Sequence, residues 1–191
     1  MESTFNSPRI ALTGSIACGK SLFAKFLRGL GVQTLDADDI VHELIPAEER
    51  RRLAPIVFAD SVARKALEAR IHPLVRDRVE RWFREEVDAR GSSSLHARPI
   101  RVAIIPLLFE CNWDADYDII ICISSPAEEQ IRRMVETRGL TRAAAEARLS
   151  AQLPVSEKAA RSHYVVVNDS TVEHLREEAA RCVEWLRSRQ S

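Results

Sequence analysis

The sequence lacks an excess of charge of either sign, because its 28 Lys and Arg residues are balanced by 28 Asp and Glu residues. Such a chain has no overall field that would draw it to nucleic acid or to a membrane surface. It also lacks long apolar runs, and residues 1–9 have no apolar core of the secretion-signal kind. We therefore expect a cytoplasmic protein, by default a monomer, that binds neither nucleic acid nor a membrane. Any anionic ligand must then be held by local Arg and Lys clusters.

Cysteine is scarce and scattered. The four residues Cys18, Cys111, Cys122 and Cys182 form no C-x-x-C pair. This spacing argues against a zinc site and against a disulfide framework. Internal repeats and low-complexity segments are missing as well. A length of 191 residues suits one α/β domain with a modest appendage.

Residues 14–21, Gly-Ser-Ile-Ala-Cys-Gly-Lys-Ser, fit the pattern G-x-x-x-x-G-K-[ST] of a phosphate-binding loop. An apolar run precedes this segment and a helical pattern follows it, as the motif requires. Glycines let backbone N–H groups turn toward phosphate oxygens, while Lys20 reaches the β- and γ-phosphates and Ser21 offers a hydroxyl to Mg²⁺. The sequence thus predicts a nucleoside triphosphate site, with a chance Gly-rich turn as the alternative. We expect this site to include Gly14, Ser15, Ile16, Ala17, Cys18, Gly19, Lys20, Ser21 and Leu22.

Short apolar runs alternate with longer stretches of helical spacing, which is typical of a parallel sheet with helices on both faces. We expect strands at about 10–13, 33–35, 100–105, 118–123 and 164–168, with helices at about 20–30 and 171–189. Residues 39–89 contain no convincing strand and predict successive helices with a break at Pro73. Such a helical insertion is where a kinase usually keeps its second substrate.

Acidic residues follow the second predicted strand as Asp36-Ala37-Asp38, whereas the third ends in Ile104-Ile105-Pro106 without an acid. In an extended strand end, side chains at i and i+2 face the same side. One carboxylate could then steer a metal-bound water while the other accepts a proton from an attacking hydroxyl. This arrangement suits a small-molecule kinase better than a GTPase. The alternative is that Asp38 or Asp39 merely caps the next helix.

Arginine is concentrated after the fourth predicted strand, at positions 132, 133, 138, 142 and 148. A γ-phosphoryl group in transit needs cations on its oxygens, and a helical pair turning at Gly139 would form a lid over ATP at residues 132–152. For two or three of these residues we expect only a solvated helix face. The spacing does not indicate which Arg contacts the nucleotide.

At this point the motifs, taken in order, resemble the dephospho-coenzyme A kinase family over nearly the whole chain. The most family-specific of them is Pro106-Leu107-Leu108-Phe109-Glu110. The others are Leu12-Thr13-Gly14, Gly19-Lys20-Ser21, Asp36-Ala37-Asp38, Leu67-Glu68 with His72-Pro73, Gln130 with Arg133, residues 148–152, Pro154, Lys158 and Asn168.

The resemblance implies a transferase that uses ATP to phosphorylate the ribose 3′-hydroxyl of dephospho-CoA, the last step of coenzyme A synthesis. It implies one P-loop kinase domain over residues 1–191, with a five-stranded parallel core, a helical CoA-binding subdomain at 39–90 and a lid at 132–152. It assigns the role of general base to Asp38. Asp36 and Ser21 are then the expected ligands of Mg²⁺. It places Pro106, Leu107 and Glu110 by the acceptor, His72 in the CoA subdomain, Asn168 near adenine, and Arg138 and Arg148 in the lid.

Three departures from the family pattern stand out. Between Leu44 and Arg50 the chain lacks much of a usual segment, so the helical subdomain is expected to be short. Ala17 and Cys18 stand where the family favours glycine, and we expect both to keep ordinary negative φ values because they carry Cβ atoms. Leu22 replaces a usual Thr, and Thr137-Arg138 shifts the lid Arg by one position.

Two other functions remain open on the residues alone. One is a different small-molecule or nucleoside monophosphate kinase that uses Asp38 in the same way. The other is a nucleotide-binding regulator without catalysis, which the joint presence of Lys20, Ser21 and Asp38 disfavours. Two interpretations of Cys18 also stay open: a reactive thiol beside the phosphates, or a buried and inert one.

Overall fold

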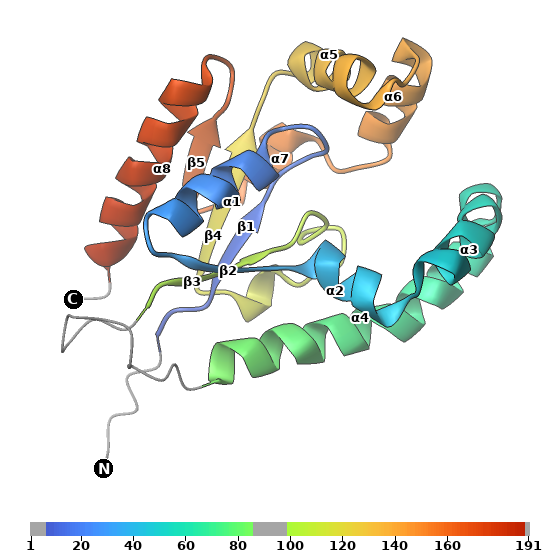
Figure 1. Ribbon diagram of the computed structural model, residues 1–191, viewed down its shortest axis with the longest axis horizontal. Coiled ribbons are helices and arrows are strands. Elements are labelled where there is room, and N and C mark those ends of the chain that lie inside the picture. Colours follow the sequence, from blue (N-terminus) through green and yellow to red (C-terminus); the bar gives the residue numbers. More distant parts are fainter. Residues whose placement is uncertain (1–6, 86–98, 190–191) are drawn as a thin grey trace. The chain divides into compact units, whose positions relative to one another are not determined.

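The computed structural model describes residues 7–85 and 99–189 (Figure 1). Residues 86–90, the end of the expected helical insertion, lie outside this description. The chain divides into two compact units. The first comprises residues 1–34 and 93–191, and the second comprises residues 35–92.

A five-stranded sheet in the order β2-β3-β1-β4-β5 forms the centre of the first unit, and the last two residues of β2 are counted with the second unit. Its strands are β1 (Ile10–Thr13), β2 (Gln33–Asp36), β3 (Arg101–Ile104), β4 (Ile119–Ser124) and β5 (Tyr164–Val167). Strand β1 runs parallel to both β3 and β4, and β4 runs parallel to β5. This confirms the predicted parallel sheet. Because the chain leaves β1 toward one edge and later returns to the other, the end of β1 is a topological switch point, where such sheets bind ligands.

Two helices cover one face of this sheet. Helix α1 (Lys20–Gly29) packs against α8 (Val172–Arg187), as Figure 1 shows in blue and red. The buried side of α1 joins alternate residues of β4 and the buried side of α8 in one apolar core. Strands β1 and β4 are almost wholly buried, which is typical of parallel strands covered on both faces.

Within the described residues, three further α-helices of this unit follow β4, and a short 3₁₀ helix precedes it. Helices α5 (Ala127–Arg138) and α6 (Arg142–Ser150) form a hairpin that turns at Gly139, where φ is 63°. Helix α7 (Val155–Ala160) lies against β4, and a short 3₁₀ helix η1 spans Asp114–Asp116. No helix within the described residues is long and apolar enough to cross a membrane.

The second unit is helical, as the sequence predicts. It contains α2 (Ala37–Leu44), α3 (Ala47–Ala59) and α4 (Ser61–Arg84), and α4 packs against both others. The predicted break at Pro73 is wrong, because α4 continues through it. Proline removes one backbone hydrogen bond from a helix, and the packing of α4 with its buried Val75 and Val79 outweighs that loss.

Candidate active site

The phosphate loop, residues 14–19, connects β1 to α1 and depends on glycine at both ends. Gly14 has φ of 142° and Gly19 has φ of 102°, conformations that side chains rarely adopt. A Cβ at Gly14 would collide with the Ile123 carbonyl oxygen and lie 2.8 Å from Cys18 Sγ. A Cβ at Gly19 would collide with the side-chain amide of Asn168. The motif glycines are therefore required both by conformation and by space.

Ala17 corrects one expectation. Its φ is 58°, in the left-handed region, so the prediction of an ordinary value is wrong for this residue. A left-handed residue with a Cβ costs about 1–2 kcal/mol, and local contacts hold it there. The Ala17 carbonyl accepts a hydrogen bond from Arg133 Nη1 at 3.3 Å. The side chains of Ile16 and Ala17 also pack against the small apolar core of the α5–α6 hairpin.

Lys20 begins α1 and folds over the loop. Its Nζ donates to the carbonyls of Gly14 at 2.7 Å and Ser15 at 2.8 Å. The N-terminus of α1 has no side-chain cap and no acidic residue in its first turn. Helix N-termini of this kind attract anions. Ser21 lies in the same turn and is exposed, so the loop offers an ammonium, a hydroxyl and unshielded amides together.

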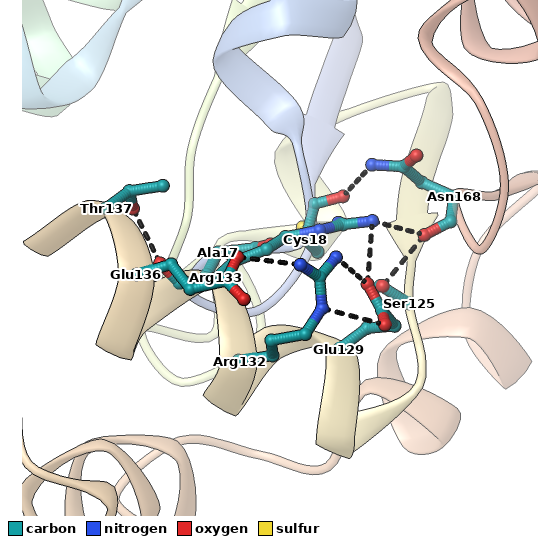
Figure 2. A network of polar contacts seen from close by, with 9 residues as sticks. All are labelled: Ala17, Cys18, Ser125, Glu129, Arg132, Arg133, Glu136, Thr137 and Asn168. Atoms are coloured by element: carbon teal, nitrogen blue, oxygen red, sulfur yellow. Dashed lines mark hydrogen bonds and ion pairs between the residues drawn. The ribbon is translucent and has the colours of Figure 1, made fainter.

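Asn168 and Arg133 fasten the outer turn of the loop (Figure 2). Asn168 follows β5 and donates through Nδ2 to the Cys18 carbonyl at 2.9 Å. Arg133 Nη2 donates to the Asn168 carbonyl at 3.1 Å, and Ser125 Oγ donates to the same oxygen at 2.8 Å. Asn168 thus lies against the phosphate loop, while its expected place near adenine stays a prediction. The contact that Arg133 makes was missed, because the spacing of five arginines does not show which one faces the loop.

The other arginines of the hairpin differ in what they bind. Arg132 pairs with Glu129 and Glu136, and Arg142 pairs with Glu128 and Glu146. These are exposed pairs of little energetic weight. A hydrogen bond from Arg142 holds the pKa of Glu128 below its ordinary value, and one from Arg132 does so for Glu129.

Arg138 and Arg148, the two lid candidates, are exposed and make no hydrogen bond or ion pair within the part of the chain that the structure describes. Their guanidinium groups are therefore available to a ligand.

Glu110, expected beside the acceptor, is tied to a buried lysine. Lys158 is 0% exposed, and its Nζ lies 2.7 Å from Glu110 Oε1. The same ammonium donates to the Pro106 carbonyl at 3.1 Å. Glu110 Oε2 is buried and makes no hydrogen bond to any described residue. Leu107, in the same segment, is exposed, so the Pro106–Glu110 segment has one side in the protein interior and one at the surface.

Asp36 and Asp38 lie in the second unit, and their arrangement corrects the sequence interpretation. Helix α2 begins at Ala37, so the two residues do not share an extended strand end. Asp36 is the N-cap and accepts a hydrogen bond from the Asp38 amide at 3.0 Å. Carboxylates stabilise the positive end of a helix, which favours this start. Asp38 and Asp39 occupy the first turn with exposed side chains, so neither is the cap.

The described residues contain no group of three or more His, Cys, Asp and Glu side chains that could hold a metal ion.

The cysteine thiols of the described residues are mostly buried. Cys18 is wholly buried, which favours the interpretation that its thiol is inert. Burial raises the pKa of Cys122 and of Cys182 to about 12. His72 lies half-buried on α4.

Comparison with known proteins identifies the family. A family model described as dephospho-CoA kinase matches residues 9–49 and 47–174. A dephospho-CoA kinase of Anaeromyxobacter dehalogenans is 38% identical over 200 residues, covering 93% of this chain and 92% of the relative. The structure of a dephospho-CoA kinase from Campylobacter jejuni is 26% identical, with a TM-score of 0.65, and covers 92% of this chain and 95% of that one. A shikimate kinase from Acinetobacter baumannii, 18% identical, shares the fold with a TM-score of 0.59 over 97% and 96% of the two chains. The chain belongs to the dephospho-CoA kinase family.

Proposed function

We propose that this chain transfers the γ-phosphoryl group of ATP to the ribose 3′-hydroxyl of dephospho-CoA, giving coenzyme A and ADP. Membership in the family supports this activity. The single observation that carries it is the intact phosphate loop, in which Lys20, an uncapped helix N-terminus and Ser21 meet after β1. A regulator without catalysis has no need of this set.

The phosphate loop and the α5–α6 hairpin would contact different parts of ATP. Loop amides and Lys20 hold the β- and γ-phosphates, while the available guanidinium groups of Arg138 and Arg148 neutralise charge that spreads over the transferring group. Asn168 is held against the loop by its hydrogen bond to the Cys18 carbonyl, and in the complex it would lie near the adenine. Closure of the hairpin over ATP would exclude water and so protect the phosphoryl group from hydrolysis.

Magnesium fits the residues as a partner of the nucleotide. Mg²⁺ usually takes one or two protein oxygens together with phosphate oxygens and water, and the described residues contain no carboxylate cluster that would hold it alone. The hydroxyl of Ser21 and the carboxylate of Asp36 would hold it beside ATP. When bound, Mg²⁺ supplies positive charge to the β- and γ-phosphate oxygens.

The acceptor would be activated by Asp38. Its exposed carboxylate takes the proton of the ribose 3′-hydroxyl as the oxygen attacks the γ-phosphorus, and the bond from that phosphorus to the β,γ-bridging oxygen breaks to release ADP. Pro106, Leu107 and Glu110 would lie by the acceptor. His72 belongs to the helical CoA-binding unit. The family model matches the chain in two segments that meet at residues 47–49. This interruption supports a shortened form of that unit.

An acceptor panel tests the proposal. The purified chain is supplied with ATP, Mg²⁺ and dephospho-CoA, AMP or shikimate in turn, and ADP release is followed by a coupled assay. We expect turnover with dephospho-CoA, and phosphorus NMR of the product should show a new 3′-phosphomonoester. Preference for AMP or shikimate would replace the proposed acceptor, and ATP binding without turnover on any acceptor would indicate a regulator.

A further inference from the structure

Among the described residues of the first unit, Lys158 is a buried charged side chain to which the proposed reaction gives no role. It is 0% exposed and pairs with Glu110 at 2.7 Å. A buried ammonium is costly unless it is paired and hydrogen-bonded. Even a satisfied pair adds little stability, because apolar residues of similar volume often replace such pairs without loss. The fold alone therefore does not explain why this position holds an ion pair.

One line of contacts leads from the pair to the start of the phosphate loop. Lys158 Nζ donates to the Pro106 carbonyl at 3.1 Å. The same oxygen accepts a hydrogen bond from Thr13 Oγ1 at 3.3 Å. Thr13 is the last residue of β1 and directly precedes Gly14. The ammonium and the end of the central strand thus share one acceptor.

A second line leads to the next residues of the loop. Glu110 Oε1 accepts a hydrogen bond from the Leu153 amide at 3.1 Å. The Leu153 carbonyl accepts from Ser15 Oγ at 3.5 Å, and the neighbouring Gln152 accepts through Oε1 from the Ile16 amide at 2.8 Å. The segment that joins α6 to α7 therefore connects Glu110 with two consecutive loop residues.

The loop residues reached in this way also position Lys20. Its Nζ is held by the carbonyls of Gly14 and Ser15, so a shift of Ser15 would move the ammonium away from the phosphates. We propose that Lys158 and Glu110 are positioning residues whose ion pair holds residues 13–16 in the arrangement that receives the triphosphate of ATP. This inference rests on the proposed function only in taking ATP as the ligand.

The first test replaces the whole pair. The double variant Glu110→Gln/Lys158→Met keeps similar volumes and leaves no unpaired buried charge. We expect a melting temperature within a few degrees of the parent, while the dissociation constant for ADP·Mg²⁺, measured by calorimetry, rises at least about tenfold. The KM for ATP should rise more than kcat falls. Parental nucleotide affinity in a folded double variant would overturn the proposal.

The matched control removes an ion pair elsewhere in the same unit. Glu178 and Arg181 pair on the surface of α8, so Glu178→Gln/Arg181→Met deletes the same charges without touching the loop. We expect parental affinity and turnover from this variant. Weakened nucleotide binding in the control as well would mean that loss of charge, not loss of positioning, explains the first result, and would also overturn the proposal.

Gln152→Met keeps the test decisive if the double variant does not fold. It leaves the ion pair intact and removes only the acceptor of the Ile16 amide. We expect a severalfold rise in the dissociation constant at an unchanged melting temperature. Parental affinity in this variant would overturn the proposal.

The same substitution also tests whether the ion pair acts on the loop through residues 152 and 153. Added to the double variant, Gln152→Met should weaken binding by less than about twofold more, because these contacts no longer depend on the ion pair. Fully additive effects would show that the ion pair does not act through these contacts. Since nucleotide affinity is measured without an acceptor, inactivity of the parent toward dephospho-CoA would refute the proposed function and leave this inference standing.

Discussion

Asp38 is the residue on which the proposed chemistry depends most. It lies in the first turn of α2 next to Asp39, and both carboxylates are exposed. The neighbours therefore share a helix end and differ mainly in direction around its axis. This gives the residue a matched control within the same turn.

We predict that Asp38→Asn lowers kcat by at least about 10²-fold, the scale expected when a general base is lost. The KM for ATP should change little, because the amide keeps the shape of the carboxylate. Steady-state kinetics with both substrates measures this split. Asp39→Asn should remain within about twofold of the parent. Equal loss in both variants would show that the charge of the turn matters, and near-parental activity of Asp38→Asn would place the base elsewhere.

Lys20 invites a different prediction, because its ammonium contacts only loop carbonyls and the nearby Cys18 sulfur in the described structure. Lys20→Met should abolish turnover while the melting temperature stays within a few degrees. Thermal unfolding and the coupled assay on one preparation measure both. A variant that fails to fold would assign Lys20 to the structure of the loop instead.

Single residues also show where sequence reasoning reaches its limit. The sequence predicted that Asp36 and Asp38 share an extended strand end, which is wrong, because the spacing does not reveal that α2 begins at Ala37. Ala17 was expected at negative φ on steric grounds that hold for an isolated residue. The contact with Arg133, more than a hundred positions later, overrides that preference.

At the scale of elements, the phosphate loop combines two required glycines with a strained alanine. Glycine tolerates positive φ without the steric cost that a Cβ brings. Replacing Gly14 or Gly19 by Ala should therefore harm the loop, whereas replacing Ala17 by Gly should not.

We expect Ala17→Gly to fold with a melting temperature within a few degrees of the parent and to keep its activity within about threefold, since relief of strain offsets the added freedom of the unfolded chain. Gly19→Ala should weaken ADP·Mg²⁺ binding at least about tenfold, because its Cβ would meet the Asn168 amide at a φ of 102°. Calorimetric titration of both variants decides the matter. Equal affinity in the two would mean that the loop adjusts freely.

Elements with a local signal were predicted well. The strand, loop and helix from Ile10 to Gly29 follow from an apolar run, a motif and a helical pattern that are contiguous in sequence. Pro73 was misjudged, because the packing of α4 against two other helices is a tertiary effect that the local pattern does not contain.

At the scale of the whole molecule, the contacts that hold the loop were not predictable. Lys158 entered only as a residue in a family pattern, and nothing in its neighbourhood indicates a partner at Glu110. Sequence patterns report period and motif, whereas ion pairs between distant segments depend on how the sheet brings those segments together.

The buried thiols make stability depend on pH at the alkaline end. Burial raises the pKa of Cys182 from 9.0 to about 12. Between these values the unfolded chain releases the thiol proton and the folded chain keeps it. The contribution of this thiol to stability is therefore fully present below pH 9 and is lost as the pH rises toward 12. Between pH 8 and pH 10 the titration of this thiol should lower the free energy of unfolding by roughly 1 kcal/mol.

Urea unfolding of the parent and of Cys182→Ala at both pH values measures this. The variant loses apolar packing equally at both, so only the pH-dependent part of the difference reports on the thiol. We expect the gap in unfolding free energy between parent and variant to narrow by roughly 1 kcal/mol at pH 10. A constant gap would mean that the thiol titrates alike in both states.

The distance along the chain between the loop and its supports sets the order in which the site can form during synthesis. Cys18 and Asn168 are 150 positions apart, and Ile16 and Gln152 are 136 apart. At about 5–20 residues per second, the ribosome needs roughly 7–30 s to deliver those partners after the loop has emerged. A nascent chain that already displays the complete nucleotide motif therefore lacks a nucleotide site until the segment after β5 is made. Ribosome-bound chains that stop before Gln152 should not be retained on immobilised ATP.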